Sequence, residues 1–293
     1  MKFFAKFGPA YLMLLLPVAC FALFSVYPLL WAVKYVFYYY DGLFTERFTG
    51  WTNMSRLMSD ELYWQSLWKQ GLFALKVLIE LPVAFLLALL LHRQTRGGNV
   101  FRAVFLMPYI LPGTTMAMVL YLLLNPYNGD LNRLLLALGV VDQPVQFLAV
   151  GWTAFLSGIG LDAWQNFGIN MLFFLVGLSS IPKEVYESAA IDGASGWQTV
   201  RSISLPMMGR ILQIILFLSI LGTLKSIGPY LVLTNGGPNY ATENTFLYIF
   251  HQFFSGAGSV NYGYGATVAV FTAILLLALS VGYFRLTKRM DYH

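Results

Sequence analysis

Polar side chains recur at helical spacing inside a long apolar stretch near the middle of the sequence. Asp162, Asn166 and Asn170 lie four residues apart, with Gln165 beside them, so these groups share one face of a helix. Polar groups inside the membrane are costly, so each is a functional candidate until a structural partner is named, and Trp164 lies between them. A tryptophan that packs in the core or at an interface is the alternative for Trp164.

A stripe of hydroxyl groups lies in the next apolar stretch. Ser219, Thr223 and Ser226 fall at positions i, i+4 and i+7 of one helix face, with Lys225 beside them. Two polar stripes on neighbouring helices could enclose a hydrated path. Hydroxyls at this spacing also bond to their own helix backbone or to a packed neighbour, so packing is an equal alternative for this stripe.

Charged residues inside apolar stretches need a partner or a function, because an unpaired charge in lipid is costly. Lys225 is the intramembrane cation nearest to Asp162 in the sequence. The two residues therefore either form an ion pair that joins their helices or line the path. Lys76 and Glu80 lie four residues apart, and we interpret them as a structural ion pair.

No group of residues predicts a metal site or an enzyme. The three histidines, His92, His251 and His293, are far apart in the sequence, and Cys20 is the only cysteine. The sequence contains no Walker A motif and no visible set of nucleophile, base and metal ligands. We therefore predict no catalytic residue, no metal and no bound cofactor.

The elements that must position these side chains are membrane-spanning helices. Of the 293 residues, 58% are hydrophobic and only 11% are charged, whereas soluble domains carry about 25% charged residues. The net charge of +5 is not gathered on one segment, so nucleic acid is not a predicted partner. We expect an all-α membrane protein with six transmembrane helices. Apolar stretches of the length that crosses a bilayer lie at 9–33, 71–91, 103–124, 149–178, 209–232 and 264–284.

The distribution of lysine and arginine indicates the orientation in the membrane. Placing both termini in the cytoplasm puts most basic residues on the cytoplasmic side. Lys2 and Lys6 precede the first apolar stretch as in a signal peptide, but the stretch is long and lacks a small-residue cleavage site, so we expect a retained helix. The resulting organisation is a first helix with an external segment over 1–70, a core of five helices over 71–286 and a cytoplasmic tail over 287–293.

Two external segments have simple interpretations. Residues 55–69 suit a helix at the membrane surface, because Trp64 and Trp68 recur at helical spacing beside charged neighbours. Residues 234–239 contain Asn-Gly-Gly-Pro, which is typical of a turn that reverses the chain.

A cytoplasmic loop over 179–208 carries the most specific pattern. Pro182 suits a helix start, Glu187 complements its N-terminal end, and Gly193 suits its left-handed cap. This predicts a helix of about three turns, followed by a second helical stretch that Pro206 interrupts. An ordinary connector helix is an equal alternative to a docking helix. The docking interpretation rests on a smooth patch of small side chains suited to a groove of another protein, made of Ala189, Ala190 and Ala194.

The same loop contains a longer motif. The pattern Glu-x-Ala-x-x-x-Gly, nine residues, then Ile-x-Leu-Pro runs through residues 187–206, with Ser188 where alanine is usual. It resembles the EAA motif of permease subunits in bacterial ATP-binding-cassette (ABC) importers. Residues 125–132, 177–194 and 233–238 are similar to the carbohydrate-importing branch of these permeases.

The resemblance implies a type I importer permease fold in a bacterial cell membrane. The implied partners are membrane lipid, a second homologous permease, two cytoplasmic ATPases that bind and hydrolyse the ATP, an extracytoplasmic solute-binding protein, and a sugar or oligosaccharide. The two permeases would form a heterodimer, with a homodimer as the alternative, and the turn over 234–239 would contact the solute-binding protein. The loop would dock in an ATPase cleft through Glu187, Ser188, Ala189, Ala190, Asp192, Gly193 and Ala194.

The resemblance also implies a substrate path. Positions 162, 166, 169, 219, 223 and 226 resemble those that line the sugar site of a maltose-type permease. Ser219 keeps the hydroxyl of that site, whereas Asp162 replaces an amide and Ile169 replaces an aromatic residue. These departures keep the site polar and leave the sugar open, including an acidic or phosphorylated one. The implied path consists of Asp162, Trp164, Gln165, Asn166, Ile169, Ser219, Thr223, Lys225 and Ser226.

Two other classes of protein compete with this interpretation. A secondary transporter or channel that works alone would rely on ion-coupling carboxylates or on inverted repeats. No such repeat is visible, and Asp162 and Glu80 alone are weak support. A membrane-embedded enzyme would need a catalytic constellation, which the sequence does not show.

Overall fold

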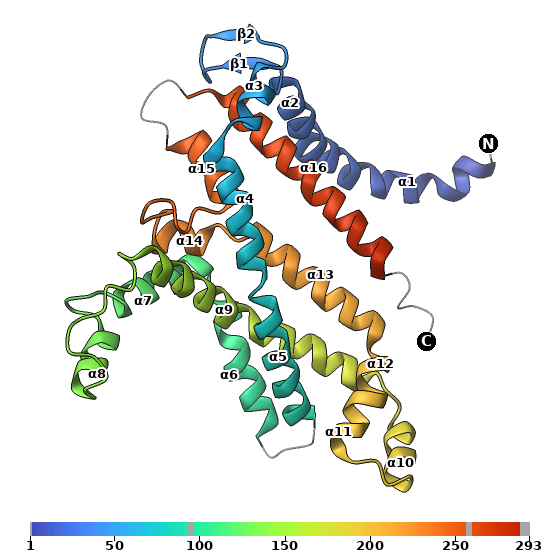
Figure 1. The fold of residues 1–293 in the computed structure, drawn as a ribbon. Helices are drawn as coiled ribbons and strands as arrows, with labels where there is room; N and C mark the ends of the chain where they lie inside the picture. The colour runs from blue at the N-terminus through green and yellow to red at the C-terminus, as the bar shows by residue number, and fades with distance from the viewer. Residues whose placement is uncertain (1, 93–96, 256–259, 288–293) are drawn as a thin grey trace. The chain divides into compact units, whose positions relative to one another are not determined.

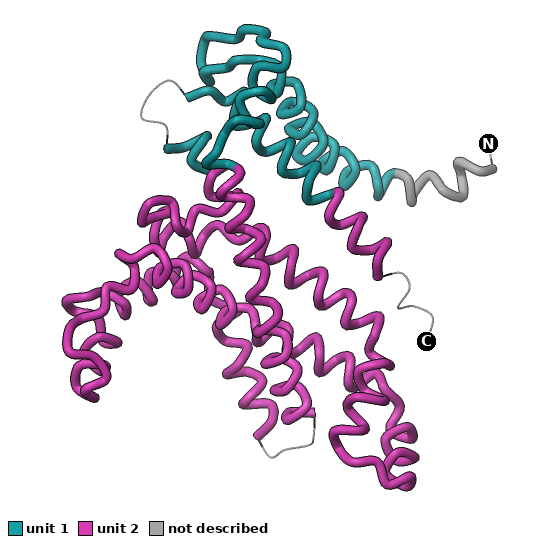
Figure 2. Tube along the Cα trace, in the orientation of Figure 1, with its two compact units in different colours: residues 1–63, 249–277 teal, residues 64–248, 278–293 magenta. Residues whose placement is uncertain are grey.

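The protein is almost entirely helical (Figure 1). A computed structural model describes residues 2–92, 97–255 and 260–287, with side chains from Leu12 onward. Residues 288–293 of the predicted tail, His293 among them, lie outside the described residues. The chain consists of two compact units, which Figure 2 distinguishes by colour.

The first unit comprises residues 1–63 and 249–277. A single short antiparallel hairpin, β1 with β2, is the β-structure of the described chain. The remaining elements of this unit are helical. In chain order the unit contains α1 (Lys2–Phe21), the π-helical turn η1 (Ala22–Val26), α2 (Tyr27–Tyr35), β1 (Tyr38–Tyr40), β2 (Glu46–Phe48), α3 (Thr52–Met58), the first residues of α4 (Glu61–Ala74), and most of α15 (Thr245–Phe254) and α16 (Tyr262–Thr287).

Buried side-chain amides and hydroxyls hold this first unit together. The Asn53 amide donates to the carbonyl oxygens of Val36 at 3.0 Å and Tyr38 at 2.8 Å, which fixes the start of the hairpin. The hydroxyls of Tyr63 and Thr272 lie 3.1 Å apart and connect segments that are distant in the sequence. Because these groups are buried, each hydrogen bond also avoids the cost of an unsatisfied polar atom.

The second unit comprises residues 64–248 and 278–293. It carries every side chain that the sequence analysis placed in the path or in the docking loop. Besides most of α4 and the adjoining ends of α15 and α16, it contains α5 (Val77–His92), α6 (Gly98–Ile110), α7 (Gly113–Leu123), α8 (Asp130–Ala137), α9 (Gly151–Ser179), α10 (Lys183–Ile191), α11 (Gly196–Thr199), the π-helical turn η2 (Val200–Ser204), α12 (Leu205–Met207), α13 (Gly209–Lys225) and α14 (Gly228–Leu233).

Helix α9 is the centre of the second unit. It contacts α5, α6, α7, α13 and α14. The close approach of α6 depends on Gly168, because a Cβ atom there would overlap the carbonyl of Phe105. A continuous apolar core joins α5, α9 and α13, and includes Leu81, Ala84, Met171, Phe174, Leu178 and Ile215.

The third and fourth predicted transmembrane segments differ from the structure. Among the described residues, four segments are long and apolar enough to cross a membrane: Leu12–Tyr35, Glu61–His92, Gly209–Leu233 and Tyr262–Thr287. The predicted span 103–124 is a broken pair, α6 and α7, bent by 92°. Its break lies at Leu111 and Pro112, where the backbone is extended. The predicted span 149–178 corresponds to α9, which is 29 residues long but is not among the apolar spans.

The predicted surface helix over 55–69 is wrong. Helix α3 ends at Met58, and α4 begins at Glu61 as the first part of the span Glu61–His92. The same helix buries Ser66 and Gln70 in the protein, so its polar residues do not face water. The second span is therefore longer at its N-terminal end than composition indicates.

Candidate functional site

A buried ion cluster lies where α9 meets the turn between α4 and α5. The Lys76 ammonium nitrogen is 2.6 Å from Glu80 Oε2 and 2.7 Å from Asp162 Oδ2, and all three side chains are at most 3% exposed. The predicted Lys76–Glu80 ion pair is thus confirmed. Asp162 pairs with Lys76 and not with Lys225, so the ion pair considered between Asp162 and Lys225 is absent.

Two hydrogen-bonded arms run from this cluster to α13. In one arm, Asn170 Nδ2 donates to Glu80 Oε1 at 2.5 Å, and the Ser219 hydroxyl donates to Asn170 Oδ1 at 3.0 Å. In the other arm, the Ser226 hydroxyl donates to Asp162 Oδ1 at 3.1 Å. The network therefore ties three helices together, and we call it the polar lattice. Its members are Lys76, Glu80, Asp162, Asn170, Ser219 and Ser226.

Side chains also satisfy the backbone where α13 breaks. Ser226 is extended, with ψ 114°, so the helix stops inside the span Gly209–Leu233 before α14 begins. Gln70 donates to the carbonyl of Thr223 at 3.2 Å, and Asn244 donates to that of Ser226 at 2.9 Å. Backbone groups at membrane depth must be paired within the protein. Irregular backbone of this kind is characteristic of transport sites built from broken helices.

Gln165 performs the same task at the α6–α7 break. Its side-chain amide donates to the carbonyl of Leu111 at 3.0 Å. This bond explains how a bend of 92° is accommodated in an apolar segment. Gln165 lies on the predicted polar face of α9, but in the structure it supports the neighbouring bend.

The structure brings together only part of the predicted path. Asp162, Asn166 and Ser226 meet at the Asp162 side chain. The Asn166 amide donates to the Asp162 carbonyl at 2.7 Å and lies 3.4 Å from Asp162 Oδ1, the same atom that accepts from Ser226. Ser219 joins through Asn170. Asp162 and Asn170 are buried behind this face, whereas Asn166, Ser219 and Ser226 are half-buried at its edge.

The remaining predicted path residues lie apart from the polar lattice. The Thr223 hydroxyl donates to the carbonyl of Ser219 within its own helix at 2.9 Å, and Thr223 is buried. Ile169 is half-buried. Lys225 is exposed and forms no ion pair with any residue that the structure describes. Trp164 is 50% exposed and turns to another side of α9.

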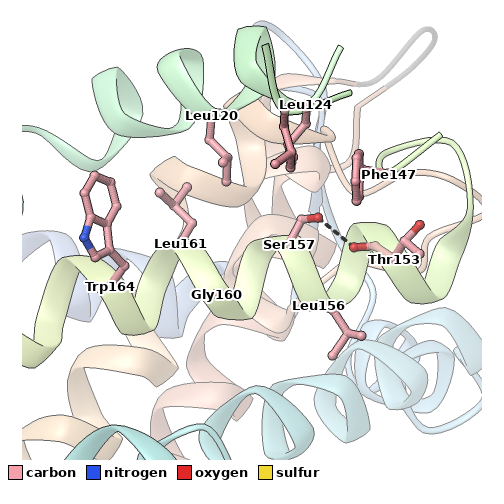
Figure 3. A pocket seen from close by; sticks show the side chains of 10 residues that line it. Leu120, Leu124, Phe147, Thr153, Leu156, Ser157, Gly160, Leu161 and Trp164 are labelled. Carbon is pink, nitrogen blue, oxygen red and sulfur yellow. Dashed lines mark hydrogen bonds between the residues drawn. The ribbon is translucent and has the colours of Figure 1, made fainter. Parts of the chain in front are cut away.

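Trp164 lines an apolar pocket between α7, α8 and α9. Figure 3 shows Leu161 and Trp164 rising from α9 toward Leu120 and Leu124. The pocket has a volume of about 520 Å³. Its hydroxyl at Ser157 is bonded to the Thr153 carbonyl at 2.8 Å, so the pocket offers mainly apolar surface.

The predicted docking helix is α10, which begins after Pro182 and ends at Ile191. Gly193 has φ 76°, its N–H donates to the Ala190 carbonyl at 3.2 Å, and the Ala194 N–H donates to the Ala189 carbonyl at 2.9 Å. These two bonds define a Schellman cap, and a left-handed residue at its centre favours glycine. The predicted glycine cap is therefore confirmed.

Only part of the predicted small-residue patch is available to a partner. Ala189 is buried, and Val185 and Tyr186 pack against the core of α5, α9 and α13. Including Ala189 in an exposed patch was wrong. The outer face of the loop carries Glu187, Ser188, Ala190, Asp192 and Gly193, with Ala194 half-buried.

Sequence reasoning missed the supporting residues Gln70 and Asn244 and assigned Lys76 too small a role. Lys76 and Glu80 were recognisable as a local pair, but nothing in the sequence connected Lys76 to Asp162. Buried glutamine and asparagine beside a helix break carry no distinctive spacing. An intramembrane amide could have been found as a residue needing a partner, but the partner itself is set by the tertiary packing.

Comparison with known proteins identifies the family. Residues 80–292 match the model of the binding-protein-dependent transport system inner membrane component. The chain belongs to this family. The match covers α9, the polar lattice apart from Lys76, and the loop with α10, so the features described above lie within the family's own domain.

Several transport permeases are similar to this family member along most of its length. The trehalose/maltose transport system permease protein MalF of Thermococcus litoralis is 31% identical over 82% of this chain and 80% of its own. The sn-glycerol-3-phosphate transport system permease protein UgpA of Agrobacterium fabrum is 31% identical over 85% of this chain and 84% of its own. The multiple sugar-binding transport system permease protein MsmF of Streptococcus mutans is 28% identical over 95% of this chain and 94% of its own.

A solved structure shows the same fold. It is a chain of a bacterial ABC transporter involved in the import of the acidic polysaccharide alginate, with a TM-score of 0.83 and 21% identity over 99% of this chain and 98% of its own. A further structure of the alginate transporter, in complex with a periplasmic protein bound to an alginate pentasaccharide, gives a TM-score of 0.84 at 22% identity, again over 99% and 98% of the two chains. The predicted importer permease fold is thus confirmed, while the orientation of the termini stays a prediction.

Proposed function

We propose that this family member is the permease subunit of a carbohydrate ABC importer in the bacterial inner membrane. It forms half of a translocation path together with a second homologous permease, as a heterodimer or, alternatively, a homodimer. Two cytoplasmic ATPases bind and hydrolyse the ATP, and an extracytoplasmic solute-binding protein delivers the sugar. The permease itself has no catalytic role and no cofactor of its own.

The geometry of α10 is the observation that supports the coupling role. Val185 and Tyr186 pack against the α5–α9–α13 core, Ala189 is buried, and the cap at Gly193 closes the helix, so one side of α10 faces the protein. Its other side presents Glu187 to solvent. The ion pair of Glu187 with Lys183, at 3.0 Å, is exposed, and exposed pairs contribute about 0–1 kcal/mol. Glu187 can therefore exchange Lys183 for a basic group of an ATPase at little cost.

The relatives support the carbohydrate assignment. Permeases named for trehalose and maltose, for multiple sugars and for glycerol phosphate all align with most of this chain. The face formed by Asn166, Ser219 and Ser226 is suited to sugars, because solutes with many hydroxyl groups need several hydrogen-bonding partners at once. The alternative of a stand-alone transporter predicts solute movement without ATP.

Charge reversal on α10 tests the coupling role. In the reconstituted importer, we expect Glu187→Lys to abolish ATP-dependent sugar uptake while the protein still inserts and binds its partner permease. Glu184→Lys is the matched control, since Glu184 is exposed on the same helix in its first turn. Normal coupled uptake by Glu187→Lys, or equal losses in both variants, would show that Glu187 is not the docking residue.

A further inference from the structure

The polar lattice fixes the direction of every hydrogen bond that leads to its half-buried edge. A carboxylate can only accept, so Asn170 must turn its amide nitrogen toward Glu80 and its oxygen toward Ser219. An amide oxygen also only accepts, so Ser219 must donate. Ser226 must donate for the same reason, because its partner is Asp162 Oδ1. The protons of both hydroxyls therefore point inward.

Both acids of the lattice are carboxylates by this geometry. Glu80 receives Lys76 on one oxygen and Asn170 on the other. Asp162 Oδ2 lies 2.7 Å from the Lys76 ammonium nitrogen in an ion pair, and Asp162 Oδ1 accepts from Ser226. No oxygen is left to donate a proton, so one cation faces two anions and the lattice carries one excess negative charge.

The edge of the lattice consequently offers acceptors alone. A hydroxyl has one proton and two lone pairs, and the protons of Ser219 and Ser226 are engaged inward. Asn166 uses its Nδ2 group on Asp162, and its oxygen accepts no hydrogen bond from any residue that the structure describes. Thr223 uses its proton on its own helix. Every group that the half-buried face can extend to a solute is therefore a lone pair.

We propose that this face selects uncharged, polyhydroxylated saccharides over acidic ones, because the solute must supply the hydrogen-bond donors. The proposal rests on the proposed function and names the substrate class of its path. Sugar hydroxyls can donate to Ser219, Ser226 and Asn166, whereas a carboxylate or phosphate brings only acceptors and meets the excess negative charge behind the face. The exposed cation Lys225 lies outside the lattice and is the competing site for an acidic solute.

Binding to the purified importer complex, without the solute-binding protein, tests this selection. The probes are a neutral glucose trisaccharide and a uronic acid trisaccharide. We expect the neutral probe to bind about tenfold or more tightly, because an acceptor that the bound solute covers but does not pair destabilises the complex. Asp162→Asn removes the excess charge, and the new amide, with its oxygen toward Lys76, donates to Ser226 and frees the Ser226 proton. The ratio of the two affinities should therefore fall at least about fivefold. The Lys76–Glu80 pair keeps one cation opposite one anion, and the thermal unfolding midpoint of the variant checks that it is folded.

Asp130→Asn is the matched control, because it makes the same chemical change at an exposed residue of α8. The ratio of its affinities for the neutral and the uronic acid probe should equal that of the unmodified complex. Equal or tighter binding of the uronic acid probe would overturn the proposal, and loss of that binding in Lys225→Gln would assign recognition to Lys225. Binding of neither probe would overturn both the selection and the carbohydrate assignment, while ATP-dependent coupling is measured separately by uptake.

Discussion

Lys76 and Asp162 form an ion pair of 2.7 Å between segments far apart in the sequence. Because Lys76 also pairs with Glu80, one ammonium group neutralises part of two carboxylates inside the protein. Buried pairs of this kind contribute little net stability when intact, but breaking one leaves an uncompensated charge. The pair therefore specifies how α9 sits against α5, and through Ser226 how α13 sits against α9.

Removing the shared cation should destabilise the second unit strongly. We expect Lys76→Met to lower the free energy of unfolding by about 3–5 kcal/mol, because Glu80 and Asp162 then face each other without a counter-charge. Adding Asp162→Asn restores the original net charge and should recover part of that loss. Unfolding in detergent by chemical denaturant measures both changes. A Lys76→Met protein as stable as the parent would contradict the lattice.

Substitution by alanine should reduce stability at one glycine of α9 and have almost no effect at another. Gly168→Ala places Cβ against the Phe105 carbonyl and must push α6 away, whereas Gly160 has no neighbour within 4 Å. We expect Gly168→Ala to cost about 1–3 kcal/mol of stability and Gly160→Ala to cost almost nothing. Thermal unfolding of the two variants in the same detergent makes the comparison. Equal midpoints would mean that α6 and α9 are not in close contact.

Loss of the Gln165 amide should weaken the bend between α6 and α7. Gln165→Leu removes the donor to the Leu111 carbonyl, and a carbonyl group at membrane depth needs a partner within the protein. The exposed Gln143 provides a control in Gln143→Leu. Limited proteolysis or hydrogen exchange at residues 110–113 reports the local effect. Unchanged exchange in Gln165→Leu would show that the bend holds without this bond.

The carboxyl group of Asp41, in the hairpin turn of the first unit, should titrate at unusually low pH. The backbone N–H groups of Leu43 and Thr45 donate to the carboxylate of Asp41, which lowers the pKa of Asp41 from 3.8 to about 2. A lowered pKa means that the carboxylate stabilises the turn fully above pH 3.8 and loses this effect as the pH falls toward 2. A ¹³C NMR titration, assigned with Asp41→Asn, measures the midpoint. A midpoint at or above 3.8 would exclude these hydrogen bonds.

The sequence analysis succeeded where a pattern is local. The i, i+4 spacing of Lys76 and Glu80 predicted their pair, and Gly193 predicted the helix cap, because both depend on residues within one or two turns. The predicted partner of Asp162, Lys225, was wrong. It was chosen as the cation nearest to Asp162 along the chain, and distance along the chain does not give distance in the fold. The packing of α5 on α9 brings Lys76 closer than Lys225.

Burial and helix breaks were also beyond the reach of the sequence. The polar face of α9 was correctly located, yet its members face different neighbours: Asp162 faces Lys76, Gln165 faces the α6–α7 break, and Trp164 faces an apolar pocket. Hydropathy measures the mean character of a stretch and does not reveal a bend of 92° within it. Helical spacing likewise placed Ala189 in the exposed patch with Ala190, whereas Ala189 is buried.

Reconstitution in lipid vesicles tests the central claim that this permease is driven by a separate ATPase. Sugar uptake should require the partner permease, both ATPases, the solute-binding protein and ATP together. Omitting ATP, or replacing Glu187 with lysine, should reduce uptake to the level of empty vesicles. Sustained uptake by vesicles that contain this chain alone, without ATP, would contradict the account.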